Sequence, residues 1–170
     1  MDDALSVRVA VRADLPRLHP VIERAYRGDS ARQGWTHEAD LLSGERIDRA
    51  ALEAMVEDRD HRLLIAERSG VPVGSVSLTS RGEGLAYLGL LCVDPSCQAA
   101  GIGKAIIAAA ERIAHDDLGA DKLEMTVIDS RVELIAYYER RGFLRTGERR
   151  PFPVRTEPPL EMVVLEKAIL

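Results

Sequence analysis

The segment Val93–Lys104 constrains the fold of this chain more than any other part of the sequence. An apolar run, Leu85–Val93, stops just before a proline, and a turn with two glycines, Gly101 and Gly103, follows it. A helix-forming segment then continues through 105–115, with no acidic residue at its start. The order predicts a strand, a tight turn and a helix N-terminus.

This arrangement presents a row of free main-chain N–H groups to an anion. Gly101 and Gly103 let the backbone approach a phosphate because no Cβ stands in the way. The helix dipole adds about half a positive charge at the same point. The segment therefore predicts a phosphate-binding turn.

Two better-known phosphate loops do not fit the residues. A Walker loop needs glycine where Gln98 stands and a hydroxyl residue where Ala105 stands. A dinucleotide-binding turn needs a third glycine where Ile106 stands. The pattern that remains is Gln-x-x-Gly-x-Gly.

A second motif follows in the segment Arg131–Phe143. Leu134, Ile135 and Tyr138 lie on one side at helical spacing, which predicts a short amphipathic helix. Gly142 follows as its C-terminal cap. The neighbouring Tyr137 is offset by about 100° around the helix and occupies different space. Without further information, both tyrosines are equally compatible with half-buried core positions.

The glycine turn and the Tyr-Glu-Arg-x-Gly-Phe run that follows it resemble the GNAT superfamily of acyl-CoA-dependent N-acyltransferases, and the resemblance spans essentially the whole chain. It implies that main-chain amides of the turn grip the pyrophosphate of coenzyme A and that the pantetheine arm lies along the preceding strand. The implied coenzyme-binding residues are Leu91, Cys92, Val93, Gln98, Ala99, Ala100, Gly101, Ile102, Gly103, Lys104 and Arg131. Arg131 stands where the family often has asparagine, so it either reaches a phosphate or pairs with a nearby glutamate.

The resemblance also implies the catalytic residue. In many members a tyrosine hydroxyl lies near the coenzyme sulfur, and Tyr138 is the matching position. Many members place a glutamate base on the strand before the turn, but Leu85–Val93 contains no carboxylate. Glu83 lies in a turn just upstream and Tyr87 offers a water relay, so we assign no base.

The acceptor should lie near the first helices and a late loop. The candidate substrate-binding residues are Tyr26, Trp35, Glu38 and Phe152. A lone tryptophan in a polar segment is also compatible with a packing anchor. In the late loop 148–153, Arg149 or Arg150 either pairs with an anionic group of the acceptor or is offset by neighbouring glutamates.

These features predict an acetyl-CoA-dependent N-acetyltransferase, an acyltransferase of the class that transfers groups other than aminoacyl groups, acting on the primary amine of a small molecule. We expect acetyl-CoA as co-substrate and no metal. Two alternatives stay open: acetylation of a protein or peptide, and a non-catalytic acyl-CoA-binding sensor of the same fold.

Composition limits the partners and the location. The net charge of −5 and the pI of about 5.4 argue against nucleic-acid binding. The apolar stretch Ala105–Ala110 is too short for a bilayer, and the start Met1–Asp3 is acidic, so we expect a cytoplasmic protein without membrane contact. Two cysteines are too few for a disulfide scaffold. Edge strands and the apolar segment Met162–Leu165 are compatible with a homodimer.

The length of 170 residues and a hydrophobic content of 46% suit a single domain, 1–170. We expect an α/β fold with a mixed, mostly antiparallel central sheet and helices on both faces. The predicted strands are 6–11, 63–69, 71–79, 85–93, 122–128, 144–148 and 160–167. The predicted helices are 15–26, 36–42, 48–57, one ending near 117, and 131–142.

Overall fold

The computed structural model describes residues 4–26, 47–97, 101–153, 155 and 157–169. Within these residues, seven strands form one sheet in the order β1-β2-β3-β4-β5-β7-β6. Their bounds are β1 Leu5–Val9, β2 His61–Arg68, β3 Val71–Gly82, β4 Leu85–Val93, β5 Lys122–Ile128, β6 Leu144–Pro151 and β7 Glu161–Ala168. Neighbouring strands are antiparallel except β4 and β5, which are parallel.

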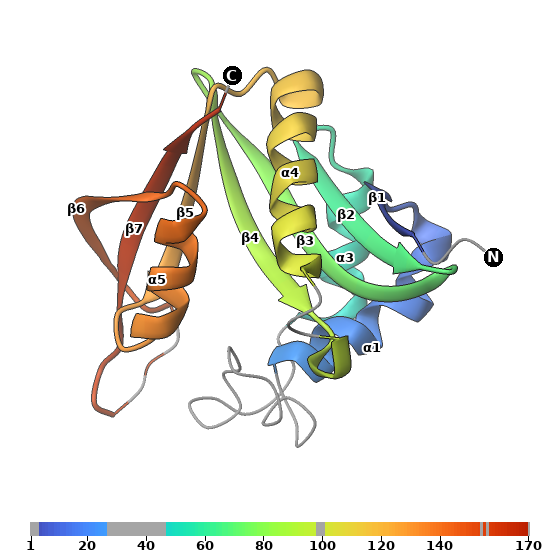
Figure 1. Cartoon of the computed structure of the whole chain (residues 1–170), viewed down its shortest axis with the longest axis horizontal. Coiled ribbons are helices and arrows are strands. Elements are labelled where there is room, and N and C mark those ends of the chain that lie inside the picture. The colour runs from blue at the N-terminus through green and yellow to red at the C-terminus, as the bar shows by residue number, and fades with distance from the viewer. Residues whose placement is uncertain (1–3, 27–46, 98–100, 154, 156, 170) are drawn as a thin grey trace.

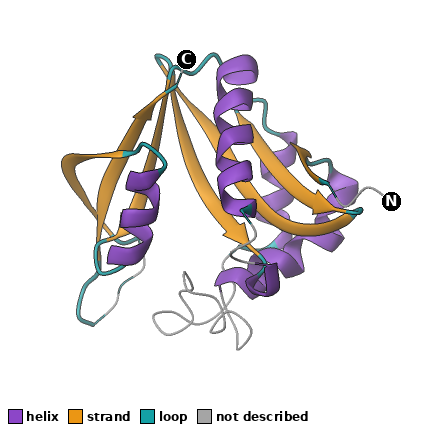
Figure 2. Ribbon diagram, in the orientation of Figure 1, coloured by secondary structure: helices purple, strands orange, loops and turns teal. Residues whose placement is uncertain are grey.

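Helices cover both faces of the sheet (Figures 1 and 2). The α-helices are α1 Leu15–Tyr26, α3 Arg49–Glu57, α4 Ile102–Leu118 and α5 Val132–Arg140, and the short 3₁₀ turns are η1 Arg12–Asp14 and η2 Pro95–Cys97. Side chains of α4 and α5 share one buried apolar cluster, and those of α1 and α3 share another with the opposite face. The expected mixed fold is confirmed. No described helix has the length and apolar character that a membrane crossing needs.

A β-bulge interrupts β4. Ser75 of β3 is opposite Cys92, but Ser77, two residues along, is opposite Gly89. Leu90 and Leu91 therefore share the space of one β3 residue, and Leu90 has a left-handed φ of 50°. Gly89 lies inside the strand, and a glycine at such a position is a sequence signal for a bulge.

The bulge exchanges the two faces of β4. Before it, Ala86 and Leu88 belong to the cluster under α4 and α5, whereas after it Leu90 and Cys92 belong to the cluster under α1. A regular strand would keep all four side chains on one face. The bulge thus turns Leu91 toward the α4 side, where it packs against that cluster.

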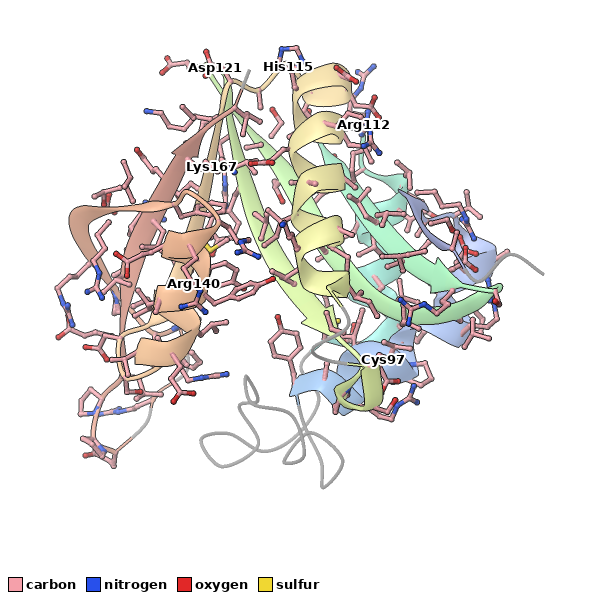
Figure 3. The ribbon with its side chains drawn as sticks, viewed as in Figure 1. Cys97, Arg112, His115, Asp121, Arg140 and Lys167 are labelled. Carbon is pink, nitrogen blue, oxygen red and sulfur yellow. The ribbon has the colours of Figure 1, made fainter. Side chains whose placement is uncertain are left out.

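Strands β4 and β5 separate soon after they meet. They pair only where Leu85–Tyr87 runs beside Lys122–Glu124, and Asp121 N–H donates to the Gly84 carbonyl at this closed end. Toward their C-terminal ends the strands diverge (Figure 1). At the closed end, Lys167 reaches from β7 to form an ion pair with Glu111 of α4 (Figure 3).

The predicted bounds 85–93 and 122–128 coincide with β4 and β5. The late loop was predicted from 148 onward, but Arg149, Arg150 and Pro151 pair with β7 and extend β6. An edge strand tolerates a proline at its end because the missing N–H faces no partner strand. The predicted helix 36–42 lies outside the described residues.

Candidate functional site

A cavity of about 110 Å³ lies where β4 and β5 diverge. Side chains of α1 and α5 contribute to its lining. Its lining residues are Tyr26, Tyr87, Leu88, Gly89, Leu90, Leu91, Met125, Thr126, Val127, Ile128, Arg131, Leu134, Tyr138 and Met162. Of the expected site residues, Tyr138, Leu91, Arg131 and Tyr26 therefore line one space, although they come from three separate segments: α1, β4, and α5 with its N-cap.

The end of α1 is fixed to the end of β4 by two side chains. The Tyr26 hydroxyl donates a hydrogen bond to the main-chain carbonyl of Leu91, the second residue of the bulge. Arg24 donates to the Asp94 carboxylate at 2.7 Å. Burial raises the pKa of Asp94, but the hydrogen bonds from Arg24 and Ser96 outweigh burial and hold that pKa below its ordinary value.

Helix α4 begins at the wide end of the opening between the strands. Gly101 stands at its N-cap with φ 76°, a conformation that favours glycine, and the first turn carries no acidic residue. Ile102 is 1% exposed and belongs to the apolar cluster under α4 and α5. Lys104 is exposed. The turn residues Gln98–Ala100 lie outside the described residues.

The two tyrosines of α5 occupy different places, as the helical offset predicted. Tyr138 is 6% exposed, packs edge-on against Phe143 and lines the cavity. Tyr137 reaches the first turn of α4, where its hydroxyl would lie 2.8 Å from a Cβ on Gly103. Burial raises the pKa of Tyr137, against the opposing charge of Arg141, whose guanidinium lies 5.2 Å from the ring centre.

The other expected site residues within the described part of the chain do not line the cavity. Cys92 is buried against the α1 side, and Val93 packs against the cluster under α4. Phe152 follows β6, where its main-chain N–H donates to Leu160. Trp35 and Glu38 lie outside the described residues.

A pair of hydroxyl groups in the cavity was not expected from the sequence, which indicated Tyr87 only as a water relay and not its partner Thr126. The Tyr87 and Thr126 oxygens lie 2.5 Å apart and bridge β4 to β5 just beyond their last paired residues. The alternation of Lys122, Glu124 and Thr126 with apolar residues was the available signal, because it places these polar side chains on one face of β5.

The two arginines of the predicted late loop, Arg149 and Arg150, are paired with carboxylates. Arg150 bonds to Glu148 and, at 2.9 Å, to the buried Glu124, and these bonds raise the pKa of Arg150. Arg149 bonds to Asp129 and, at 3.1 Å, to Glu161. The local geometry therefore agrees with the interpretation in which neighbouring acids offset these cations.

Glu83, the carboxylate just upstream of β4, does not line the cavity. It stands in the β3–β4 turn with φ 54° and is exposed, at the closed end of the strands. Within the part of the chain that the structure describes, no three side chains of the metal-binding types gather as a metal site.

Comparisons with known proteins agree with this geometry. The sequence model of the acetyltransferase (GNAT) family matches residues 22–143. Among curated proteins, mycothiol acetyltransferase from Salinispora tropica is 39% identical over 56 residues, which are 33% of this chain and 18% of that protein. The chain thus matches less than a fifth of that relative's length.

Solved structures share the fold at low identity. The ribosomal-protein-S18-alanine N-acetyltransferase from Escherichia coli superposes with a TM-score of 0.75 at 17% identity, over 98% of this chain and 94% of the other. The putative acetyltransferase yncA from Salmonella typhimurium, solved with its cofactor acetyl-CoA, gives a TM-score of 0.72 at 18% identity, over 97% of this chain and 94% of the other. A chimeric spermidine N-acetyltransferase from Vibrio cholerae and hSSAT gives a TM-score of 0.74 at 17% identity, over 96% of this chain and 95% of the other.

Proposed function

The chain belongs to the acetyltransferase (GNAT) family, and from this membership we propose that it moves an acetyl group from acetyl-CoA to the primary amine of a small molecule. The observation that carries the proposal is the position of Tyr138 and the start of α4 on one face of the sheet, at the opening between β4 and β5. The proposed anion-binding turn and the proposed proton donor thus lie on the same face of the sheet.

The N-terminus of α4 supplies the coenzyme-binding part of the proposal. The amides around Gly101–Lys104 face the pyrophosphate, and the positive end of the helix dipole attracts it. The extended pantetheine arm then follows the unpaired part of β4, beside Leu91 and Val93. The divergence of β4 from β5 leaves this edge without a partner strand.

The reaction needs three proton and charge adjustments. The acceptor arrives as an ammonium ion with a pKa of about 10.4 and must lose a proton before its nitrogen attacks. As the C–N bond forms, negative charge grows on the thioester oxygen, and a main-chain amide within Leu91–Val93 stabilises it. The C–S bond then breaks, and Tyr138 protonates the leaving thiolate.

The proton balance closes without another reactant. The ammonium loses two protons in becoming an amide. One of these protons restores the Tyr138 hydroxyl after it has protonated the coenzyme sulfur, and the other is released to solvent. No base is assigned to a carboxylate, because none of the described residues that line the cavity is an aspartate or a glutamate.

The size of the cavity supports a small acceptor. A volume of about 110 Å³, walled by Tyr26, Tyr87 and Tyr138, suits an amine on a slender chain. A protein terminus would need an open groove. Comparing a panel of free amines with a peptide array, with thiol release from acetyl-CoA as the signal, separates these acceptor classes.

The test of coenzyme binding uses two glycines of the same helix. Gly101 and Gly119 stand at opposite ends of α4, both with positive φ (76° and 64°) and both with open space where a Cβ would stand. Gly101→Leu and Gly119→Leu therefore impose similar backbone strain. We expect acetyl-CoA affinity, measured by calorimetry, to fall at least tenfold only in Gly101→Leu.

Equal affinities in the two variants would refute the phosphate site at α4. Absence of acetyl-CoA binding by the unmodified protein at millimolar concentration would refute the proposed function. Binding without thiol release, for any free amine or peptide, would instead favour the acyl-CoA-binding sensor.

A further inference from the structure

We propose that the Tyr87–Thr126 hydroxyl pair is the docking point for the nitrogen of the acceptor amine. The proposal rests on the acetyltransferase function above and adds the group that positions the nucleophile. Its basis is the 2.5 Å contact between the two oxygens and their place in the lining of the cavity.

The pair faces the side of the sheet away from the coenzyme. Ala86 and Leu88, on either side of Tyr87, belong to the cluster under α4 and α5, and so do the neighbours of Thr126. Strand alternation therefore directs Tyr87 and Thr126 toward the α1 face. The coenzyme turn and Tyr138 lie on the opposite face, so the α1 face is left for the acceptor.

The hydrogen-bonding capacity of the pair selects an N–H donor. Each hydroxyl has one hydrogen and two lone pairs. The bond between Tyr87 and Thr126 uses one hydrogen and one lone pair, so an excess of acceptor capacity remains. A primary amine, protonated or neutral, carries at least two N–H groups and matches that excess.

Neighbouring charges hold the pair in place. The Arg81 guanidinium lies 5.0 Å from the centre of the Tyr87 ring, and Glu124, the main-chain neighbour of Tyr87 on β5, is 7% exposed and bound to Arg150. These contacts fix the tyrosine ring and the start of the opening. The hydroxyl oxygens are therefore presented without the cost of ordering flexible side chains.

The test removes each hydroxyl with little change of shape. Tyr87→Phe keeps the ring, Thr126→Val keeps the volume, and Thr126→Ser restores the hydroxyl. Thr146→Val, on the exposed strand β6 outside the cavity, is the matched control. The measurements are acetyl-CoA affinity, thermal unfolding, and acceptor kcat and KM for the free amine or peptide with the fastest thiol release.

We expect acceptor kcat/KM to fall about 10- to 100-fold in Tyr87→Phe and Thr126→Val, as for the loss of a hydrogen bond to a charged group. In Thr126→Ser and Thr146→Val, acceptor kcat/KM should stay within threefold of the value for the unmodified protein. The acetyl-CoA affinity of all the variants should stay within twofold. In the double variant, acceptor kcat/KM should fall by less than the product of the two single fold-reductions, because the two hydroxyls act as one unit.

Two results would overturn the inference while leaving the acetyltransferase function intact. One is unchanged acceptor kcat/KM in both Tyr87→Phe and Thr126→Val. The other is a parallel loss of acetyl-CoA affinity, which would assign the pair to the coenzyme. An unmodified protein that binds no acetyl-CoA, or releases no thiol with any acceptor, would overturn both proposals.

Discussion

The Tyr137 hydroxyl lies over the first turn of α4, only 2.8 Å from the place that a Cβ on Gly103 would take. An alanine in place of Gly103 gains about 1 kcal/mol of helix propensity, but its Cβ clashes with the Tyr137 hydroxyl. We therefore expect Gly103→Ala to stabilise the protein in a Tyr137→Phe background and to give no gain, or a loss, when Tyr137 is present. A double-mutant cycle from urea unfolding should show a coupling of about 1 kcal/mol. Additive effects would show that the hydroxyl moves aside freely.

Tyr138→Phe tests the proton donor. The ring remains packed against Phe143, so we expect little change in fold or in acetyl-CoA affinity. Loss of general-acid assistance should lower kcat about 100-fold. Steady-state kinetics and calorimetry on the same preparation check both expectations. An unchanged kcat would assign thiolate protonation to water, and a large fall in affinity would make Tyr138 a coenzyme ligand.

The sequence predicts elements well where local signals are strong. The strands 85–93 and 122–128 were placed at the observed bounds because an apolar run in the first and a polar–apolar alternation in the second end at turn residues. Helical geometry alone predicted that Tyr137 and Tyr138 occupy different space, and the two side chains do lie in separate places. Local periodicity is sufficient for features of this kind.

The cavity depends on relationships that no local pattern contains. The bulge at Leu90 depends on pairing with β3, and the Tyr87–Thr126 contact depends on β4 and β5 separating just after Glu124. The late loop was misplaced for the same reason, since Arg150 joins β6 through its pairing with β7. Long-range pairing decides these details.

Two adjacent arginines of β6 allow a direct comparison of ion pairs. Arg150→Met leaves the carboxylate of Glu124, a residue 7% exposed, without its cation, and we expect a loss of about 1–3 kcal/mol in the free energy of unfolding. Arg149→Met removes bonds to the more exposed carboxylates of Asp129 and Glu161 and should have little effect. Urea unfolding of both variants checks this order. Equal losses would contradict the importance of burial at Glu124.

The buried Asp14 carboxylate should make stability depend on pH. Both terminal guanidinium nitrogens of Arg8 donate to it at 2.8 Å, which holds the pKa of Asp14 well below its usual range despite burial.

In the unfolded chain an aspartate has a pKa of about 3.9, so the folded state gains stability from the charged form above that value. This gain is lost as the pH falls below about 4 toward the folded-state pKa. Asp14→Asn should therefore cost about 2 kcal/mol at pH 7, less than for a fully buried pair because the Arg8 side chain is 43% exposed. The difference between the two proteins should shrink between pH 5 and pH 2.5, as measured by urea unfolding across that range. A difference that stays constant with pH would show that Asp14 acts through its hydrogen-bonding shape alone, since the amide of asparagine does not titrate.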